Sequence, residues 1–282
     1  MPYPIVLSHY QAGPLLAARR AGADRAVTSP DLGLSTVEVA LTAEGVAFPS
    51  GEALAWPELE RIARAENQCF AVEDGAARPI RVFSETTNWL RSLMPTAGAP
   101  TMLVAGFPMH RIKDTDPWAD TRAKVAAAAP VTGDVLDTAT GLGYTAIEAA
   151  KTADRVVTVE LDPAGLEVAR YNPWSRDLFE NPKIAQIVGD VFEEIARFPD
   201  GSFSRVLHDP PTLSLAGELY SGAFYRQIHR VLRPGGRLFH YIGDPTSALG
   251  KRTTAGVIRR LSEAGFRRVE RHPEAFGVVA SK

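Results

Sequence analysis

The chain has 282 residues, of which 45% are hydrophobic and 23% charged, and its formal net charge at pH 7 is -2. This composition is that of an ordinary globular protein and excludes disordered and fibrous classes. The near-neutral charge argues against a protein that grips long stretches of nucleic-acid backbone.

Length and cysteine content limit the possibilities further. Single cores stop growing near about 250–300 residues, so we expect one large domain with a smaller one appended. Cys69 is the only cysteine, which excludes an internal disulfide and a cysteine-based zinc site, and we expect no metal. No stretch approaches the roughly 18 apolar residues that span a bilayer, and the N-terminus does not read as a signal peptide. We therefore expect a cytoplasmic protein that does not contact membranes.

The N-terminal region, residues 1–118, predicts a small α+β domain. The stretch TVEVALTAEGVAFPSGEALAW is typical of an antiparallel hairpin. A helix over Pro57 to Glu66 and two short strands, CFAVED and PIRVFS, should follow it. The stretch from Met94 to Trp118 is rich in Pro, Gly and Thr and predicts a connection to the second domain. We expect this first domain to select the substrate.

Charged side chains crowd the end of that connection, in the segment MHRIKDTDPW. We predict that His110, Arg111 and Lys113 bind the substrate. The competing interpretation is a solvated connection with local ion pairs.

The C-terminal region, residues 119–282, predicts a parallel sheet covered by helices, because short β-branched runs alternate with helical segments. The predicted parallel strands are Asp134 to Asp137, Arg155 to Glu160, Ile184 to Val188, Phe203 to His208 and Arg237 to Ile242. A helix over Glu218 to Arg233 should end at the Pro-Gly-Gly that follows it. A further helix, Thr253 to Ala264, and the two strands of FRRVERHPEAFGVVA should complete the sheet with an antiparallel hairpin. The fold class is therefore α/β, a Rossmann-like sheet with an appended α+β domain.

A glycine-rich turn follows the first parallel strand, in VLDTATGLGYTA. The strand ends at Asp137, and Gly141 and Gly143 precede a helix that should begin near Tyr144. Glycines let the backbone turn sharply and approach a ligand closely. Taken alone, this pattern fits a structural turn or a dinucleotide site as well.

Acidic residues end the next two strands, at Glu160 and Asp190. An acid about twenty residues after the glycine turn is placed to accept the hydroxyls of a ribose. At the third strand, a polar group can meet the edge of an adenine. For either residue alone, a helix N-cap or a solvated turn is the simpler explanation.

These pieces, with HDPP and RVLRPGGRLFHY, follow the order of the class I methyltransferases, and the sequence from about residue 120 onward resembles that family. The resemblance implies S-adenosylmethionine as cofactor, with Asp137 at its amino-acid end, the glycine turn beneath it, Glu160 on its ribose and Asp190 at its adenine. Ala139 replaces a glycine of many members and should tighten the loop slightly. An NAD enzyme is the nearest alternative, but it does not account for the DPP or the closing hairpin. The complete predicted cofactor site comprises Asp137, Thr138, Gly141, Gly143, Tyr144, Glu160, Leu161, Asp190 and Val191.

The predicted reaction centre is His208-Asp209-Pro210-Pro211, at the end of the fourth parallel strand. It resembles the (Asp/Asn)-Pro-Pro-aromatic motif of amino-group methyltransferases, in which the acid and a proline carbonyl accept hydrogen bonds from an NH2 group. We therefore predict Asp209, Pro210 and His208 as catalytic, with His208 as a proton acceptor of near-neutral pKa. Pro211 and Thr212 should contact the substrate. Thr212 stands where the motif has an aromatic residue, so the ring that would stack on a planar base is absent, which argues against adenine or guanine as the substrate. A rigid proline loop and a buried histidine are the structural alternatives.

Three other functions remain open. The segment from DPP to PGG also resembles spermidine synthases, which transfer an aminopropyl group, although Leu142 stands where those enzymes carry an acid. The arginines of GKRTTAGVIRRL and FRRVERH would suit an RNA methyltransferase or a solvated surface. A non-catalytic cofactor sensor is the third possibility. The acceptor is unassigned between a small amine, a protein and RNA, and an oligomer is possible.

Overall fold

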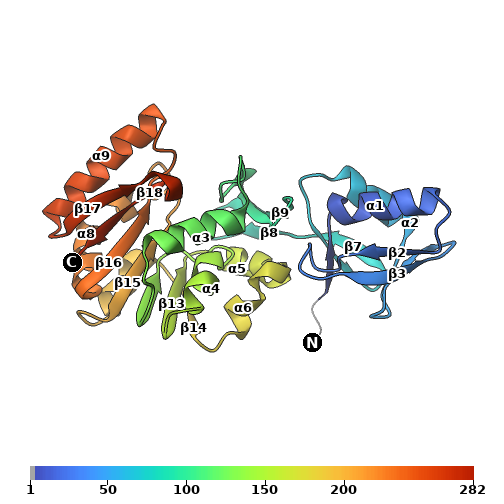
Figure 1. The fold of residues 1–282 in the computed structure, drawn as a ribbon, viewed down its shortest axis with the longest axis horizontal. Coiled ribbons are helices and arrows are strands. Elements are labelled where there is room, and N and C mark those ends of the chain that lie inside the picture. Colours follow the sequence, from blue (N-terminus) through green and yellow to red (C-terminus); the bar gives the residue numbers. More distant parts are fainter. Residues whose placement is uncertain (1–3) are drawn as a thin grey trace. The chain divides into compact units, whose positions relative to one another are not determined.

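The fold is that of a computed structural model, which describes residues 4–282 (Figure 1). Residue contacts divide the chain into two compact units. The first contains the chain up to Trp118 together with Ala164–Arg176, and the second contains Ala119–Pro163 with Asp177–Lys282. That one unit selects the substrate while the other binds the cofactor stays a prediction.

The second unit contains a seven-stranded sheet with the order β14-β13-β12-β15-β16-β18-β17. Strands β12 to β16 run parallel to one another, whereas β18 is antiparallel to both β16 and β17. The predicted fold class, a Rossmann-like sheet closed by an antiparallel hairpin, is confirmed. The strands are β12 (Asp134–Asp137), β13 (Arg155–Glu160), β14 (Ile184–Val188), β15 (Phe203–His208), β16 (Leu232–Tyr241), β17 (Arg267–His272) and β18 (Gly277–Ser281).

Helices connect these strands, as the alternating sequence pattern predicted. Figure 1 shows α9 alongside the antiparallel edge formed by β17 and β18. The α-helices from the end of the first unit onward are α3 (Pro117–Ala127), α4 (Tyr144–Ala150), α5 (Pro163–Tyr171), α6 (Arg176–Glu180), α7 (Val191–Glu194), α8 (Gly222–Val231) and α9 (Ala248–Glu263).

The helix predicted over Glu218 to Arg233 is shorter than expected. A 3-10 turn, Gly217–Tyr220, comes first, and α8 begins after Ser221, whose side chain accepts a hydrogen bond from Phe224 N at 3.1 Å. Such a cap satisfies an amide that would otherwise lack a partner, so it fixes where the helix starts. The Pro-Gly-Gly segment after the helix lies within β16.

The core of the second unit holds the sheet and its helices together. In α8, Phe224, Tyr225, Ile228 and Val231 are all fully buried. Complete burial of such a side chain contributes about 1.5–3 kcal/mol. The packed helix gives the strand ends a rigid support, which a site built on them requires.

The first unit contains three small antiparallel sheets, with the orders β1-β6-β7, β2-β3-β4-β5 and β11-β10-β9-β8. Its core includes Leu7, Leu15, Trp56 and Phe70. The strands are β1 (Ile5–Leu7), β2 (Arg25–Thr28), β3 (Val37–Leu41), β4 (Gly45–Ala47), β5 (Ala53–Ala55), β6 (Phe70–Glu73), β7 (Ala76–Pro79), β8 (Arg81–Ser84), β9 (Trp89–Met94), β10 (Thr101–Val104) and β11 (Phe107–Pro108), and the helices are α1 (His9–Arg20) and α2 (Trp56–Arg64).

The stretch from Met94 to Trp118 is more ordered than the predicted connection. It contains β10 and β11, which pair with each other, and β10 also pairs with β9. These strands are only four and two residues long. Their short apolar runs are masked in the sequence by the surrounding Pro and Gly, so the hairpin escaped prediction.

Candidate active site

Three acidic side chains lie at the carboxyl ends of three adjacent strands of the large sheet, β13, β12 and β15. Strand β12 lies between β13 and β15, and Asp137 pairs in register with Thr158 on one side and Leu207 on the other. Carboxyl ends of parallel strands meet at the same edge. Asp137, Glu160 and Asp209 therefore lie at this edge, and the pKa of Asp137 is raised by burial and, to a smaller extent, by the charges of Asp209 and Glu160.

Asp137 is the most deeply buried of the three acids, with 0% of its surface exposed. Its Oδ2 accepts a hydrogen bond from Thr158 Oγ1 at 2.8 Å, whereas Oδ1 has no hydrogen-bond partner among the described residues. Burial raises the pKa of Asp137 to about 8. A buried oxygen without a partner costs about 1–3 kcal/mol, which a ligand that donates to it would recover.

The glycine turn forms as predicted and is held by Glu160. Gly141 and Gly143 have φ angles of 53° and 78°, in the left-handed region that favours glycine. Glu160 Oε2 accepts from Gly141 N at 2.7 Å, and Oε1 accepts from Asp162 N at 3.0 Å. A Cβ at Gly143 would lie 2.6 Å from the side chain of Leu178, so any larger residue would displace that neighbour.

The remaining predicted cofactor residues differ in accessibility. Asp190 caps α7, since its Oδ1 accepts from Phe192 N at 2.8 Å, which is the simpler role considered for it. Leu161 is 51% exposed, whereas Val191 and Tyr144 are buried. The contact between Asp190 and an adenine stays a prediction. The helix cap uses only Oδ1 of Asp190, so Oδ2 can still accept a hydrogen bond from a ligand.

Asp209 takes part in a buried ion cluster that the sequence did not predict. The Nζ of Lys124, on α3, lies 2.6 Å from Asp209 Oδ2 and 2.8 Å from Asp120 Oδ2. Only 3% of the Lys124 side chain is exposed, against 19% for Asp209. Burial raises the pKa of Asp209, and the charge of Lys124 opposes this shift. The available signal was the i,i+4 pair of Asp120 and Lys124 in a helix of small residues, but such pairs also occur on exposed helices.

The near-neutral pKa predicted for His208 is wrong. The imidazole is fully buried, and burial lowers its pKa to about 3. Nε2 lies 3.0 Å from the carbonyl oxygen of Leu219, so it carries the proton, and Nδ1 accepts from Thr138 Oγ1 at 2.6 Å. Both nitrogens are occupied and the ring is neutral, so His208 supports the loop and is unsuited to exchange protons near pH 7.

The predicted substrate residues fall into two groups. Pro211 and Thr212 are exposed beside Asp209, and the Pro211 carbonyl accepts from the hydroxyl of Tyr220 at 3.0 Å. His110, Arg111 and Lys113 belong to the first unit, where His110 Nδ1 lies 2.9 Å from Thr101 Oγ1. Their role toward a substrate stays a prediction.

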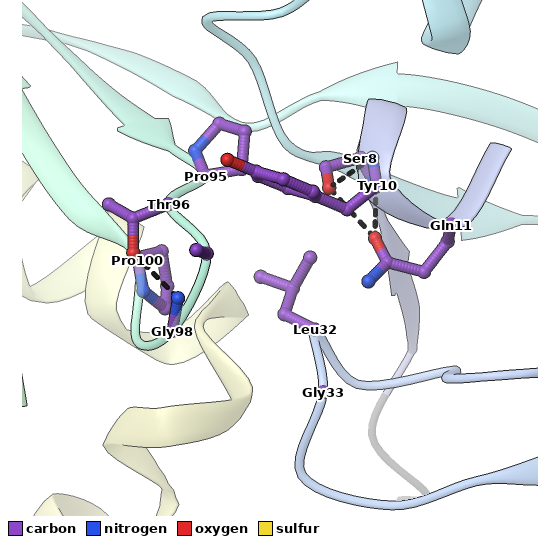
Figure 2. Close-up of a pocket in the computed structure, with 10 residues that line it drawn as sticks. Ser8, Tyr10, Gln11, Leu32, Gly33, Pro95, Thr96, Gly98 and Pro100 are labelled. Atoms are coloured by element: carbon purple, nitrogen blue, oxygen red, sulfur yellow. Dashed lines mark hydrogen bonds between the residues drawn. The ribbon is translucent and has the colours of Figure 1, made fainter. Parts of the chain in front are cut away.

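The first unit has a shallow pocket of its own, shown in Figure 2. Tyr10 lies beside Pro95 there, and the Ser8 hydroxyl donates to Gln11 Oε1 at 2.8 Å. The residues that line the pocket are Ser8, Tyr10, Gln11, Leu32, Gly33, Pro95, Thr96, Ala97, Gly98 and Pro100. The three charged residues predicted to bind substrate are not among them.

None of the helices within residues 4–282 combines the length and the apolar character that a bilayer span requires. Within the same residues, no three His, Cys, Asp or Glu side chains gather in a way that could hold a metal ion.

Comparison with known proteins links this geometry to a family. Residues 135–236 match a methyltransferase domain family, a segment that includes the glycine turn and the Asp209 loop. An uncharacterized protein from Methanocaldococcus jannaschii is 44% identical over 237 residues, which cover 83% of this chain and 80% of that protein. A polyamine aminopropyltransferase from Mycobacterium tuberculosis is 34% identical over 102 residues, which cover 33% of this chain but only 19% of the enzyme.

Solved structures agree on the fold. A spermidine synthase from Thermotoga maritima superposes with a TM-score of 0.57 at 19% identity, covering 72% of each chain. At this identity the similarity extends to the fold alone.

Proposed function

The chain belongs to the class I, Rossmann-like S-adenosylmethionine-dependent methyltransferase family, and on that premise we propose that it transfers a methyl group to a nitrogen acceptor at Asp209. The observation that carries this proposal is the gathering of Asp137, Glu160 and Asp209 at adjacent strand ends, beside a glycine turn. Ligands of open α/β sheets bind outside the carboxyl ends of the strands.

The residues of this edge fit the methyl donor in two respects. Asp137 has a buried oxygen without a partner among the described residues, which suits the ammonium of the donor's amino-acid end. Gly141 and Gly143 keep side chains out of the turn, so a nucleoside can approach the backbone closely. We assign the ribose to Glu160 and the adenine to Asp190, because carboxylate oxygens accept hydrogen bonds from hydroxyl and amino groups.

When bound, the donor supplies a methyl group on a positively charged sulfur. The task of the protein is orientation, which can contribute about 7–11 kcal/mol. Asp209 and the Pro210 carbonyl accept hydrogen bonds from the acceptor's NH2, aiming the nitrogen lone pair at the methyl carbon. The new N–C bond forms as the S–C bond breaks, the bonding electrons stay on sulfur, and the displaced proton leaves through Asp209 to solvent.

The direct test is incubation with methyl-labelled S-adenosylmethionine and cell extract, fractionated into small molecules, protein and RNA. We expect label in one fraction, at an initial rate about 100- to 1,000-fold lower when Asp209→Ala replaces the natural protein. The matched control is Asp200→Ala, an exposed acid paired with Arg230, which should label as the natural protein does. Failure of the purified protein to bind S-adenosylhomocysteine would falsify the proposal.

Aminopropyl transfer is the second candidate, because polyamine aminopropyltransferases align with part of this chain. Leu142 argues against it, since this position in the glycine loop is fully buried and offers no acid. Calorimetry separates the two reactions. We expect tighter binding of S-adenosylmethionine than of its decarboxylated form, and the reverse order would favour aminopropyl transfer.

A further inference from the structure

Lys124 is a buried lysine, and burial of its charge is unfavourable to the stability of the fold. Its side chain is 3% exposed, and an ammonium taken out of water loses several kcal/mol of solvation unless it is paired. Two carboxylates pair with it, Asp120 four residues earlier on α3 and Asp209 after β15. The ring of Tyr241, at the end of β16, lies 4.3 Å from the ammonium. Three separate elements therefore hold this one charge in place.

A buried ion cluster is not the only way to fill this part of the core. Buried ion pairs and triads are often no more stabilising than apolar side chains of similar volume. The pair within α3 would by itself partner the lysine, so the bond to Asp209 is additional. That bond joins α3 to the loop after β15, which the proposed function places at the reacting atoms.

The bond to Lys124 occupies one oxygen of Asp209 and leaves the other as an acceptor for a ligand. All the hydrogen bonding of this carboxylate with the described residues goes through Oδ2, which accepts from Lys124. Oδ1 makes no hydrogen bond with the described residues. The Asp209 side chain is 19% exposed to solvent, so a ligand can approach it. An ionised carboxylate accepts hydrogen bonds at both oxygens, whereas a protonated one carries a donor.

We propose that Lys124 is a positioning residue, which binds Oδ2 of Asp209, favours the ionised form of the carboxyl and presents Oδ1 to the acceptor amine. Asp120 completes the arrangement by fixing the ammonium from its own helix. This inference rests on the proposed function and adds to it the group that orients Asp209. Burial raises the pKa of Asp209 and so favours the protonated form, whereas the charge of Lys124 lowers the pKa and favours the ionised form. Without Lys124, the carboxyl would take up a proton at a higher pH, next to the remaining acids Asp120 and Asp137.

Sinefungin provides a test that needs no knowledge of the acceptor. This analogue of the methyl donor carries an amine on carbon in place of the methylsulfonium, so its amine reports on hydrogen-bond acceptors at the reaction centre. S-Adenosylhomocysteine lacks both groups and serves as the reference. The quantity to measure, by calorimetry at pH 7.5, is the ratio of the two dissociation constants.

We expect the natural protein to prefer sinefungin by about tenfold, a difference of about 1.4 kcal/mol, because only sinefungin offers an amine to Asp209. Asp209→Ala and Lys124→Met should each remove the preference while leaving the affinity for S-adenosylhomocysteine within about twofold. The double variant should lose no more than either single one, since both changes interrupt the same contact. A merely structural lysine would weaken both ligands together.

Lys124→Met removes the ammonium that pairs with the buried carboxylate of Asp120, and loss of one partner of a buried ion pair is strongly destabilising. The variant Asp120→Asn with Lys124→Met removes both charges and is the substitute, with the same expected loss of preference. A preference for sinefungin that is retained in these variants but lost in Asp209→Ala overturns the role of Lys124 and leaves the proposed function standing. A natural protein that binds neither ligand counts against the proposed function itself.

Discussion

The charged side chains at the two edges of the seven-stranded sheet have different hydrogen-bond partners. At the amino ends of the strands, Arg205 donates to the carbonyl of Ala128 at 3.0 Å and Arg237 donates to that of Ala129 at 2.6 Å. Lys282 likewise donates to Leu232 O at 2.8 Å. These cations bind backbone carbonyls that end a helix or enter a strand, although burial and the neighbouring charge of Arg237 lower the pKa of Arg205.

At the carboxyl ends the charges are not satisfied in this way. Asp137 keeps a buried oxygen without a partner among the described residues, and the pKa values of Asp137 and Asp209 are both raised. Buried groups with raised pKa values concentrate at functional sites. The two edges therefore differ in their partners, because the chain supplies backbone carbonyls to the cations of one edge, whereas Asp137 at the other edge keeps an acceptor that a ligand can bind.

Loss of the acid at the reaction centre should have the largest effect. We expect Asp209→Ala to lower the methyl-transfer rate about 100- to 1,000-fold, the range for removal of one preorganised hydrogen-bonding group. Affinity for S-adenosylhomocysteine should change little, because Asp209 is assigned to the acceptor. Single-turnover rates with labelled donor measure the first effect and calorimetry the second. An unchanged rate would remove the carboxylate from the reaction.

The second largest effect concerns the donor. Asp137→Asn should weaken S-adenosylhomocysteine binding about 10- to 100-fold, since hydrogen bonds to charged groups are worth about 1.5–3 kcal/mol. Equilibrium titration measures it, and Asp134→Asn, at the opposite end of the same strand, is the matched control. Equal affinities in the two variants would place the donor elsewhere.

The amino edge should respond in stability and not in binding. Arg205 is 8% exposed and donates to the carbonyls of Ala128 and Ser204. Arg205→Met leaves both acceptors without the cation, and we expect the free energy of unfolding to fall by about 1–3 kcal/mol. Urea denaturation measures this loss, while donor affinity should stay within twofold. A large loss of affinity would contradict the division of labour between the edges.

The smallest expected effect is a pH dependence of stability that originates from Asp137. Burial raises its pKa from the usual 3.8 to about 8, so the folded state binds more protons than the unfolded state between these values. The stabilising contribution of this group is therefore complete below about pH 4 and is lost as the pH rises through about 8. Urea midpoints of the ligand-free protein at pH 5, 7 and 9 should fall more steeply than those of Asp137→Asn. Parallel profiles would contradict the raised pKa.

Local sequence patterns were sufficient for much of the second unit. Strand β12, the glycine turn and the closing hairpin were predicted because each depends on residues near one another in the chain. The positions of Asp137, Glu160 and Asp209 at the ends of their own strands were predicted in the same way, from the short apolar run before each acid.

Predictions failed where partners are distant or strands are short. Strands β10 and β11 were taken for a connection, because their few residues give no clear periodicity. The partners of the two central acids were also missed. Thr158 lies 21 residues from Asp137, and Lys124 lies 85 residues from Asp209.

The sequence by itself determined the fold class, the glycine turn and the acids at the strand ends, because these follow from periodicity and from conformational preferences of neighbouring residues. Only the tertiary structure decided the state of each group. His208 has a pKa near 3 because the packed core excludes water from it, and Lys124 meets Asp209 because a helix and a strand pack together. Desolvation and ion pairing depend on everything that surrounds a side chain, and no local pattern contains that information.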